Sequence, residues 1–185
     1  MRKFIVYIAV SADGYIARPD GDVEWLNRRP RSIDYGIGAF YSSIDTILWG
    51  RKTYDMALGF EKKGVVPTAF DPKLKHYVFS RRPPKRPPAA VQFVKGPVRK
   101  FIERLRSEPG KNVWVMGGAS LIASLLDVGA IDEFDIHMIP VFIGNGIPLI
   151  APKRRDVLLQ LLESKSYEDG VVRLRYEVAR RTREG

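Results

Sequence analysis

The chain has 185 residues, 45% of them hydrophobic and 28% charged, which is typical of a globular protein large enough to bury a core. It contains no cysteine, which excludes disulfides and thiolate chemistry. Its two histidines, His76 and His137, lack a metal-ligand spacing, so we expect no metal site. The net charge of +10 is compatible with an anionic ligand, but the basic residues form short dispersed clusters without a nucleic-acid-binding motif, so we expect no nucleic acid partner.

The first half of the chain predicts three strands, with a loop and two helices between them. Residues 3–10 form an apolar run typical of a strand buried on both faces of a parallel sheet. The run is too short to cross a membrane and has no signal-peptide cleavage pattern, so we expect a cytoplasmic protein without a membrane partner. A loop marked by Asp13-Gly14 follows, and then a helix over 32–43. The second strand, 45–49, leads directly into a helix that begins at Gly50, and the third strand covers 76–79.

The second half continues the alternation of strands and helices. The predicted elements are a strand at 91–94, a helix at 97–107, a strand at 113–116, a helix at 119–126, a strand at 131–139 and a Gly- and Pro-rich loop at 140–152. Alternating apolar and charged residues near the end predict an antiparallel hairpin that turns at 168–170. This order predicts a single α/β domain over 1–185, with helices on both faces of the sheet.

Three loops are expected at the carboxyl ends of strands, where α/β sheets bind ligands: 50–53, 80–82 and 117–120. The glycine pair in the third loop indicates either a tight turn or an anion site at a helix start. Because all three loops offer amides, hydroxyls or guanidinium groups, together they indicate an elongated polyanion site. The three-glycine dinucleotide fingerprint and the Walker A lysine motif are both absent, so the site is neither an ordinary Rossmann site nor a P-loop.

Six segments carry a resemblance to a known family. They are Ser11-Ala-Asp-Gly-Tyr-Ile-Ala17, Leu48-Trp-Gly-Arg-Lys-Thr-Tyr54, Val78-Phe-Ser-Arg81, Val115-Met-Gly-Gly-Ala119, and Ile131-Asp-Glu133 with Pro140-Val141. In this order and spacing the chain resembles the dihydrofolate reductase-like family, in the branch of the bacterial riboflavin-biosynthesis reductase domain. The resemblance implies a dihydrofolate reductase-like fold with a mostly parallel sheet of about eight strands, and NADPH as the cofactor. It also implies a homodimer formed through sheet edges and C-terminal strands, with Tyr167, Val171 and Tyr176 available to pack.

The resemblance also implies a set of cofactor-binding positions. They are Ala9, Ile16, Ala17, Gly50, Arg51, Lys52, Thr53, Ser80, Arg81, Met116, Gly117, Gly118, Ala119, Ser120 and Leu121. The first three would contact the nicotinamide, the two glycine-containing helix starts would hold the diphosphate, and Ser80 with Arg81 would lie near the 2′-phosphate. Arginines without a neighbouring carboxylate at these strand ends favour NADPH over NADH.

Four residues are expected on the substrate side. By family spacing, Asp34 is either the substrate anchor and proton relay or a first-turn acid favoured by the helix dipole. His137 is either a second catalytic residue that donates a hydrogen bond to the substrate or a buried, hydrogen-bonded histidine. Asp13 either approaches the substrate or shapes its loop, and Phe142 lies in a glycine-rich loop that borders the active site in the riboflavin branch.

The expected function is hydride transfer from NADPH to a small heterocyclic or imine/carbonyl substrate, such as an aminopyrimidine of the riboflavin-pathway type. One alternative is a reductase of dihydrofolate or another pterin. The segment Arg28-Arg29-Pro30-Arg31 stands where true dihydrofolate reductases carry a proline-tryptophan signature, which disfavours that alternative. A second alternative is a non-catalytic protein that binds nucleotides or polyanions.

Overall fold

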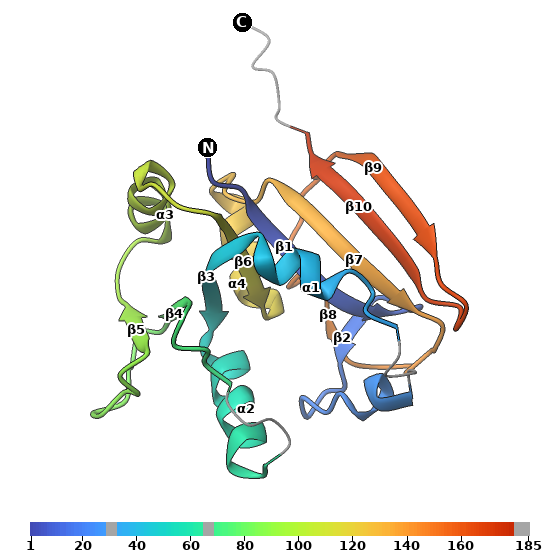
Figure 1. The fold of residues 1–185 in the computed structure, drawn as a ribbon, viewed down its shortest axis with the longest axis horizontal. Helices are drawn as coiled ribbons and strands as arrows, with labels where there is room; N and C mark the ends of the chain where they lie inside the picture. The colour runs from blue at the N-terminus through green and yellow to red at the C-terminus, as the bar shows by residue number, and fades with distance from the viewer. Residues whose placement is uncertain (29–32, 65–68, 180–185) are drawn as a thin grey trace, which may run out of the picture.

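A computed structural model describes residues 1–28, 33–64 and 69–179 of the chain (Figure 1). Its main sheet has eight strands in the order β5-β4-β3-β6-β1-β7-β10-β9. The first six are mutually parallel: β5 (Val91–Val94), β4 (Lys75–Phe79), β3 (Ile44–Gly50), β6 (Asn112–Gly117), β1 (Phe4–Ser11) and β7 (Glu133–Ile139). The hairpin β9 (Leu159–Ser166) and β10 (Val172–Val178) adds two antiparallel strands beside β7. The predicted α/β sheet with a closing hairpin is confirmed.

Helices cover both faces of the sheet, as predicted, because side chains along each strand alternate between two apolar clusters. Phe4 and Val6 of β1 pack with α3 (Val98–Ser107) and α4 (Ala119–Asp127) on one face. Ile5, between them, packs on the other face in a cluster that contains Phe40 of α1 (Ile37–Ser42) and Tyr54 of α2 (Arg51–Lys62). Among the described residues, no helix combines the length and the apolar character needed to cross a bilayer.

Two short strands and a 3-10 helix, η1 (Glu24–Arg28), were not predicted. Strand β2 (Tyr15–Ala17) pairs with β8 (Ile147–Pro148) in a separate two-stranded sheet. Two- and three-residue strands have no periodicity of their own, so both segments look like loops in the sequence. Their pairing brings residues 11–17 and 140–149 together beside the carboxyl end of β1.

The helix predicted over 32–43 is shorter than expected. Residue 32 lies outside the described residues, and α1 begins only at Ile37. Tyr35 and Gly36 have φ angles of 53° and 85°, which interrupt a right-handed helix. The carbonyl oxygen of Tyr35 accepts a hydrogen bond from His137 on β7, so a tertiary contact holds this turn in its non-helical conformation.

The hairpin offers different residues for association from those expected. Val171 is fully buried, and Tyr167 and Tyr176 are partly buried against the protein's own clusters. The exposed apolar side chains instead lie on or just before β9: Leu158, Leu159, Leu161 and Leu162.

Candidate functional site

The three predicted ligand loops lie at one edge of the sheet, because the strands that precede them are parallel neighbours. Trp49 near the end of β3 pairs with Gly117 at the end of β6 and with Val78 near the end of β4. After β4, the Ser80 amide donates to the carbonyl oxygen of Val94 at 3.3 Å, which ties this loop to the end of β5. The starts of α2 and α4 therefore meet at the edge where α/β folds bind ligands.

The two helix starts touch through glycine backbones. A Cβ built on Gly50 would lie 3.1 Å from the Gly117 carbonyl oxygen and 3.2 Å from the Gly118 nitrogen. Gly50 has an ordinary φ of −74°, so closeness rather than backbone angle requires glycine there. A Cβ on Gly118 would lie 3.2 Å from Oγ1 of Thr53, and the peptide bond between Gly117 and Gly118 is cis. We call Gly50, Gly117 and Gly118 the glycine junction; it places the amides of two helix starts side by side.

The cations of this edge are not equivalent. Nη1 of Arg51 donates to the Arg82 carbonyl oxygen at 2.7 Å, and its Nε lies 2.8–2.9 Å from both carboxylate oxygens of Asp55. The hydrogen bond with Asp55 raises the pKa of Arg51. The expectation that no carboxylate lies beside these arginines is therefore wrong for Arg51. Arg81 and Lys52 are exposed and, within the described part of the chain, neither forms an ion pair.

The positions expected around the nicotinamide lie on β1 and β2. Ala9 is half-buried on β1, and Ala17 on β2 is buried. Ile16 reaches the glycine junction, with Cδ1 3.8 Å from the Cβ position of Gly118. Strand β2 therefore brings Ile16 to the third loop, while Ala17 pairs with Ile147 of β8.

The remaining predicted cofactor residues differ in what they can present to a ligand. The side chains of Ala119 and Leu121, in the first turn of α4, are buried, so these residues can offer a ligand only their backbone. Met116 is partly buried against the cluster that contains Phe40 and Tyr54. Ser120 is exposed in the first turn of α4.

Asp13 joins the loop after β1 to the loop after β7. Its carboxylate accepts hydrogen bonds from the Ser11 hydroxyl at 2.5 Å, the Gly144 amide at 2.7 Å and the Ile143 amide at 3.1 Å. These donors, the Ser11 hydroxyl most of all, lower the pKa of Asp13. The loop-shaping role is the one this geometry supports. Phe142, next to these amides, is 79% exposed and contributes little to the core.

His137 is buried beside the turn that carries Asp34. Its Nε2 lies 2.9 Å from the Tyr35 carbonyl oxygen, and because a carbonyl only accepts, Nε2 carries the hydrogen. The Tyr7 hydroxyl also donates to this oxygen, at 3.3 Å, and burial raises the pKa of Tyr7. The Tyr35 hydroxyl donates to Asp169 in the β9–β10 turn. Strand β7 and the hairpin thus fix the turn on either side.

Asp34 itself is exposed and accepts a hydrogen bond from the Gly38 amide at 3.2 Å, in the first turn of α1. The structure brings Asp34 and His137 together through Tyr35, while leaving Asp34 with a capping contact. Trp25 was missed in the sequence: it is 4% exposed, packs in the cluster that includes Ala9 and Tyr35, and its Nε1 has no hydrogen-bond partner among the described residues. Only the folded structure reveals this unpaired donor.

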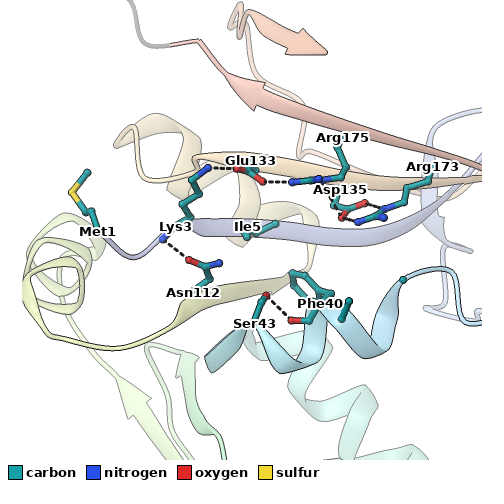
Figure 2. A pocket seen from close by; sticks show the side chains of 12 residues that line it. Met1, Lys3, Ile5, Phe40, Ser43, Asn112, Glu133, Asp135, Arg173 and Arg175 are labelled. Atoms are coloured by element: carbon teal, nitrogen blue, oxygen red, sulfur yellow. Dashed lines mark hydrogen bonds and ion pairs between the residues drawn. The ribbon is translucent and has the colours of Figure 1, made fainter. Parts of the chain in front are cut away.

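A separate hollow of about 410 Å³ lies between α1 and the strands β1, β7 and β10 (Figure 2). Figure 2 shows a row of ion pairs along this hollow. Glu133 pairs with Lys3 at 2.5 Å and Arg175 at 3.4 Å, and Asp135 pairs with Arg173 at 2.5 Å. Hydrogen bonding to Asp135 raises the pKa of Arg173. Each of the two carboxylates is paired with a basic side chain, so these ion pairs connect the strands and neither carboxylate is left to bind a ligand.

The chain is similar to known proteins over nearly its whole length. Residues 2–173 match the family model described as the RibD C-terminal domain. The protein YwjB of Bacillus subtilis (strain 168) is 37% identical over 170 residues, which cover 92% of this chain and 95% of YwjB.

Two solved structures share the fold. A putative riboflavin biosynthesis protein from Shewanella sp. PV-4 superposes with a TM-score of 0.83 and 28% identity, over 96% of this chain and 99% of that one. The Thermotoga maritima diaminohydroxyphosphoribosylaminopyrimidine deaminase/5-amino-6-(5-phosphoribosylamino)uracil reductase superposes with a TM-score of 0.70 and 15% identity, over 96% of this chain and 57% of that one. The reductase fold expected from the resemblance is thereby confirmed. The chain belongs to the RibD C-terminal domain family.

Proposed function

We propose that this chain is an NADPH-dependent oxidoreductase that reduces a small heterocyclic imine or carbonyl compound, of the aminopyrimidine type used in riboflavin biosynthesis. The observation that carries the proposal is the glycine junction. It leaves two helix starts without side chains between them, at the carboxyl edge of a parallel sheet. Amides at a helix start, together with the helix dipole, favour a phosphate group.

The residues around the junction fit NADPH. Amides of α2 and α4 suit the diphosphate, and the exposed Arg81 beside Ser80 suits the 2′-phosphate, because arginine pairs with phosphate oxygens through two parallel hydrogen bonds. Arg51 is already paired with Asp55, so its guanidinium group is not free to form two parallel hydrogen bonds with a phosphate. Ala9 and Ile16 supply an apolar surface for a nicotinamide ring. When bound, NADPH supplies the hydride.

The substrate side has a proton donor and positioning residues. Reduction of a C=N or C=O bond by hydride also requires a proton at the heteroatom. We assign that relay to Asp34, which is exposed and stands on a turn fixed from two sides. We assign His137 to positioning, because its Nε2 hydrogen bonds the Tyr35 carbonyl oxygen.

We further propose that two copies associate through β9. This strand ends the sheet order, so its outer edge has no partner in the described chain (Figure 1). On or just before this strand, Leu158, Leu159, Leu161 and Leu162 are 42–71% exposed, and exposed apolar edges of this kind favour pairing with another chain. The cytoplasm, where reduced nicotinamide cofactors are available, is the compartment that this function requires.

A direct test follows NADPH oxidation by absorbance with a panel of ribosylaminopyrimidines and pterins, while calorimetry measures cofactor affinity. We expect NADPH to bind more tightly than NADH. Arg81→Ala should weaken NADPH about ten- to a hundredfold, since a hydrogen bond to a charged group contributes about 1.5–3 kcal/mol, and should leave NADH nearly unchanged. Arg154→Ala, an exposed arginine outside these loops, is the control. Equal affinity for both cofactors would contradict the 2′-phosphate assignment, and binding of neither would refute the proposed function.

A further inference from the structure

The net positive charge of this chain comes from one edge of the sheet. Residues 72–107 contain eleven lysines and arginines and a single acidic residue, Glu103. The rest of the chain contains twenty basic and twenty acidic residues, so the whole net charge of +10 arises in this segment. The basic residues themselves are dispersed, as expected, but their excess over acidic residues is confined to this segment. The segment contains β4, β5 and α3, which lie on the side of the sheet opposite β9 (Figure 1).

These charges are turned to solvent and largely unpaired. Ten of the eleven side chains are exposed; Arg106 is partly buried. Within the described residues, only Arg106 and Arg104 form ion pairs, with Asp132 at 2.9 Å and Glu108 at 3.9 Å. Hence the positive field of this edge is not cancelled locally. We call the ten exposed side chains the basic edge: Lys73, Lys75, Arg81, Arg82, Lys85, Arg86, Lys95, Arg99, Lys100 and Arg104.

Part of the basic edge stands where helix stability disfavours it. Arg99 and Lys100 occupy the first turn of α3, which contains no acidic residue, so they face the positive end of the helix dipole. Basic residues at that end are unfavourable to the helix, whereas acidic residues there are stabilising. Helix α2 begins in the same way, with Arg51 and Lys52. Local stability therefore does not explain why these positions are basic.

The basic edge adjoins the candidate cofactor site. Strands β4 and β5 are parallel, so Ser80 and Lys95 follow strand ends that lie side by side, and Ser80 donates to the Val94 carbonyl oxygen. Helix α3 begins only four residues after Val94. The surplus charge thus continues outward from the loop assigned to the 2′-phosphate.

We propose that the basic edge is an electrostatic guide that speeds capture of phosphate-bearing ligands by the site. This inference rests on the proposed use of NADPH. Surfaces of one sign raise association rates with oppositely charged ligands by about 10- to 1000-fold, and salt suppresses the effect because the Debye length is about 10 Å at 0.1 M. The guide acts through its field, so residues that do not contact the ligand contribute to the association rate.

The test measures NADPH association and dissociation rates by stopped-flow fluorescence between about 10 mM and 500 mM salt. The double variant Arg99→Glu/Lys100→Glu removes charge from the guide while making the first turn of α3 more favourable to the helix dipole, so it should fold. The control, Lys153→Glu/Arg154→Glu, makes the same charge change in the loop beside Asp127, at the far end of α4. Thermal melting checks that both variants are folded.

We expect the guide variant to bind NADPH about tenfold more slowly at low salt, with its dissociation rate within about twofold of the unmutated protein. The difference should vanish at high salt, and the control should change by less than about twofold. NADH, which lacks the 2′-phosphate, should be affected less. If the guide variant and the unmutated protein bind NADPH at equal rates, the electrostatic guide is refuted while the proposed function stands. The same conclusion follows if the control variant loses as much association rate as the guide variant. If the unmutated protein binds a short RNA more tightly than NADPH and the guide variant loses that binding, the basic edge is a nucleic-acid-binding surface, and the proposed guide is refuted. Absence of NADPH binding in the unmutated protein refutes both this inference and the proposed function.

Discussion

Replacing Gly50 by alanine tests whether the glycine junction is a site of close backbone contact. The new Cβ would lie 3.1 Å from the Gly117 carbonyl oxygen and 3.2 Å from the Gly118 nitrogen, and both atoms are backbone. Gly117 pairs with Trp49 in the sheet, so it cannot easily move away. Alanine in an allowed conformation gains about 0.4–1 kcal/mol through the unfolded chain, and overpacking costs about 1–3 kcal/mol. The expected net loss of unfolding free energy is about 1–2 kcal/mol.

Gly59→Ala is the matched control, because it lies in the same helix, α2. Nothing lies within 4 Å of a Cβ built on Gly59, so alanine should stabilise the helix there by about 0.5–1 kcal/mol. Urea unfolding followed by circular dichroism gives both signs. Calorimetry with NADPH should show at least about a tenfold loss of affinity for Gly50→Ala and none for Gly59→Ala. If Gly50→Ala is as stabilising as Gly59→Ala and binds NADPH normally, the close-contact argument is wrong.

Three further predictions concern residues outside the junction. Burial lowers the pKa of His76, so as the pH falls the unfolded chain takes up a proton near pH 6.5 before the folded protein does. The stability that neutral His76 contributes should therefore be fully present above pH 6.5 and decrease below it, by at most about 1.4 kcal/mol for each unit by which the two pKa values differ. Denaturant titrations should show this pH dependence in the unmutated protein and lack it in His76→Phe. Leu161→Asp should convert the proposed dimer to a monomer in light scattering, whereas a monomeric unmutated protein would contradict the proposed β9 interface. Asp34→Asn should lower turnover about 10²- to 10⁴-fold and leave NADPH affinity unchanged, and a normal turnover number would exclude Asp34 as the relay.

The eight strands of the main sheet and the carboxyl edge that carries the candidate site follow from the sequence, because both depend on local patterns. Apolar runs between glycines and charges mark each parallel strand, and the helix that begins at Gly50 follows its strand directly. The start of α1 could not be predicted, since Tyr35 takes its left-handed angle while hydrogen bonding His137, which lies 102 residues away. Strand β2 was missed for the related reason that three residues are stabilised by a partner far along the chain.

In the candidate site, too, contacts between residues close in sequence could be predicted, whereas contacts between distant residues could not. The pairing of Arg51 with Asp55 spans one helical turn and could have been predicted from the i, i+4 spacing. The contacts of Asp13 with the amides at 143 and 144 depend on two loops meeting in space, and the unpaired Nε1 of Trp25 depends on what surrounds it in the core. The charge surplus of 72–107 is visible in the sequence, but only the sheet order places it along one edge.

The position of β1 has a consequence for how the protein is made. This strand lies between β6 and β7, with Phe4 beside Val113 and Ile5 beside Glu133, so both partners are synthesised more than a hundred residues later. At about 5–20 residues per second, the apolar β1 waits on the order of 5–25 s before either neighbour leaves the ribosome. Such non-local parallel pairing folds slowly and leaves apolar surface open to aggregation in the meantime. We therefore expect nascent chains of this protein to depend on chaperones that hold an N-terminal apolar segment until the last parallel strand emerges.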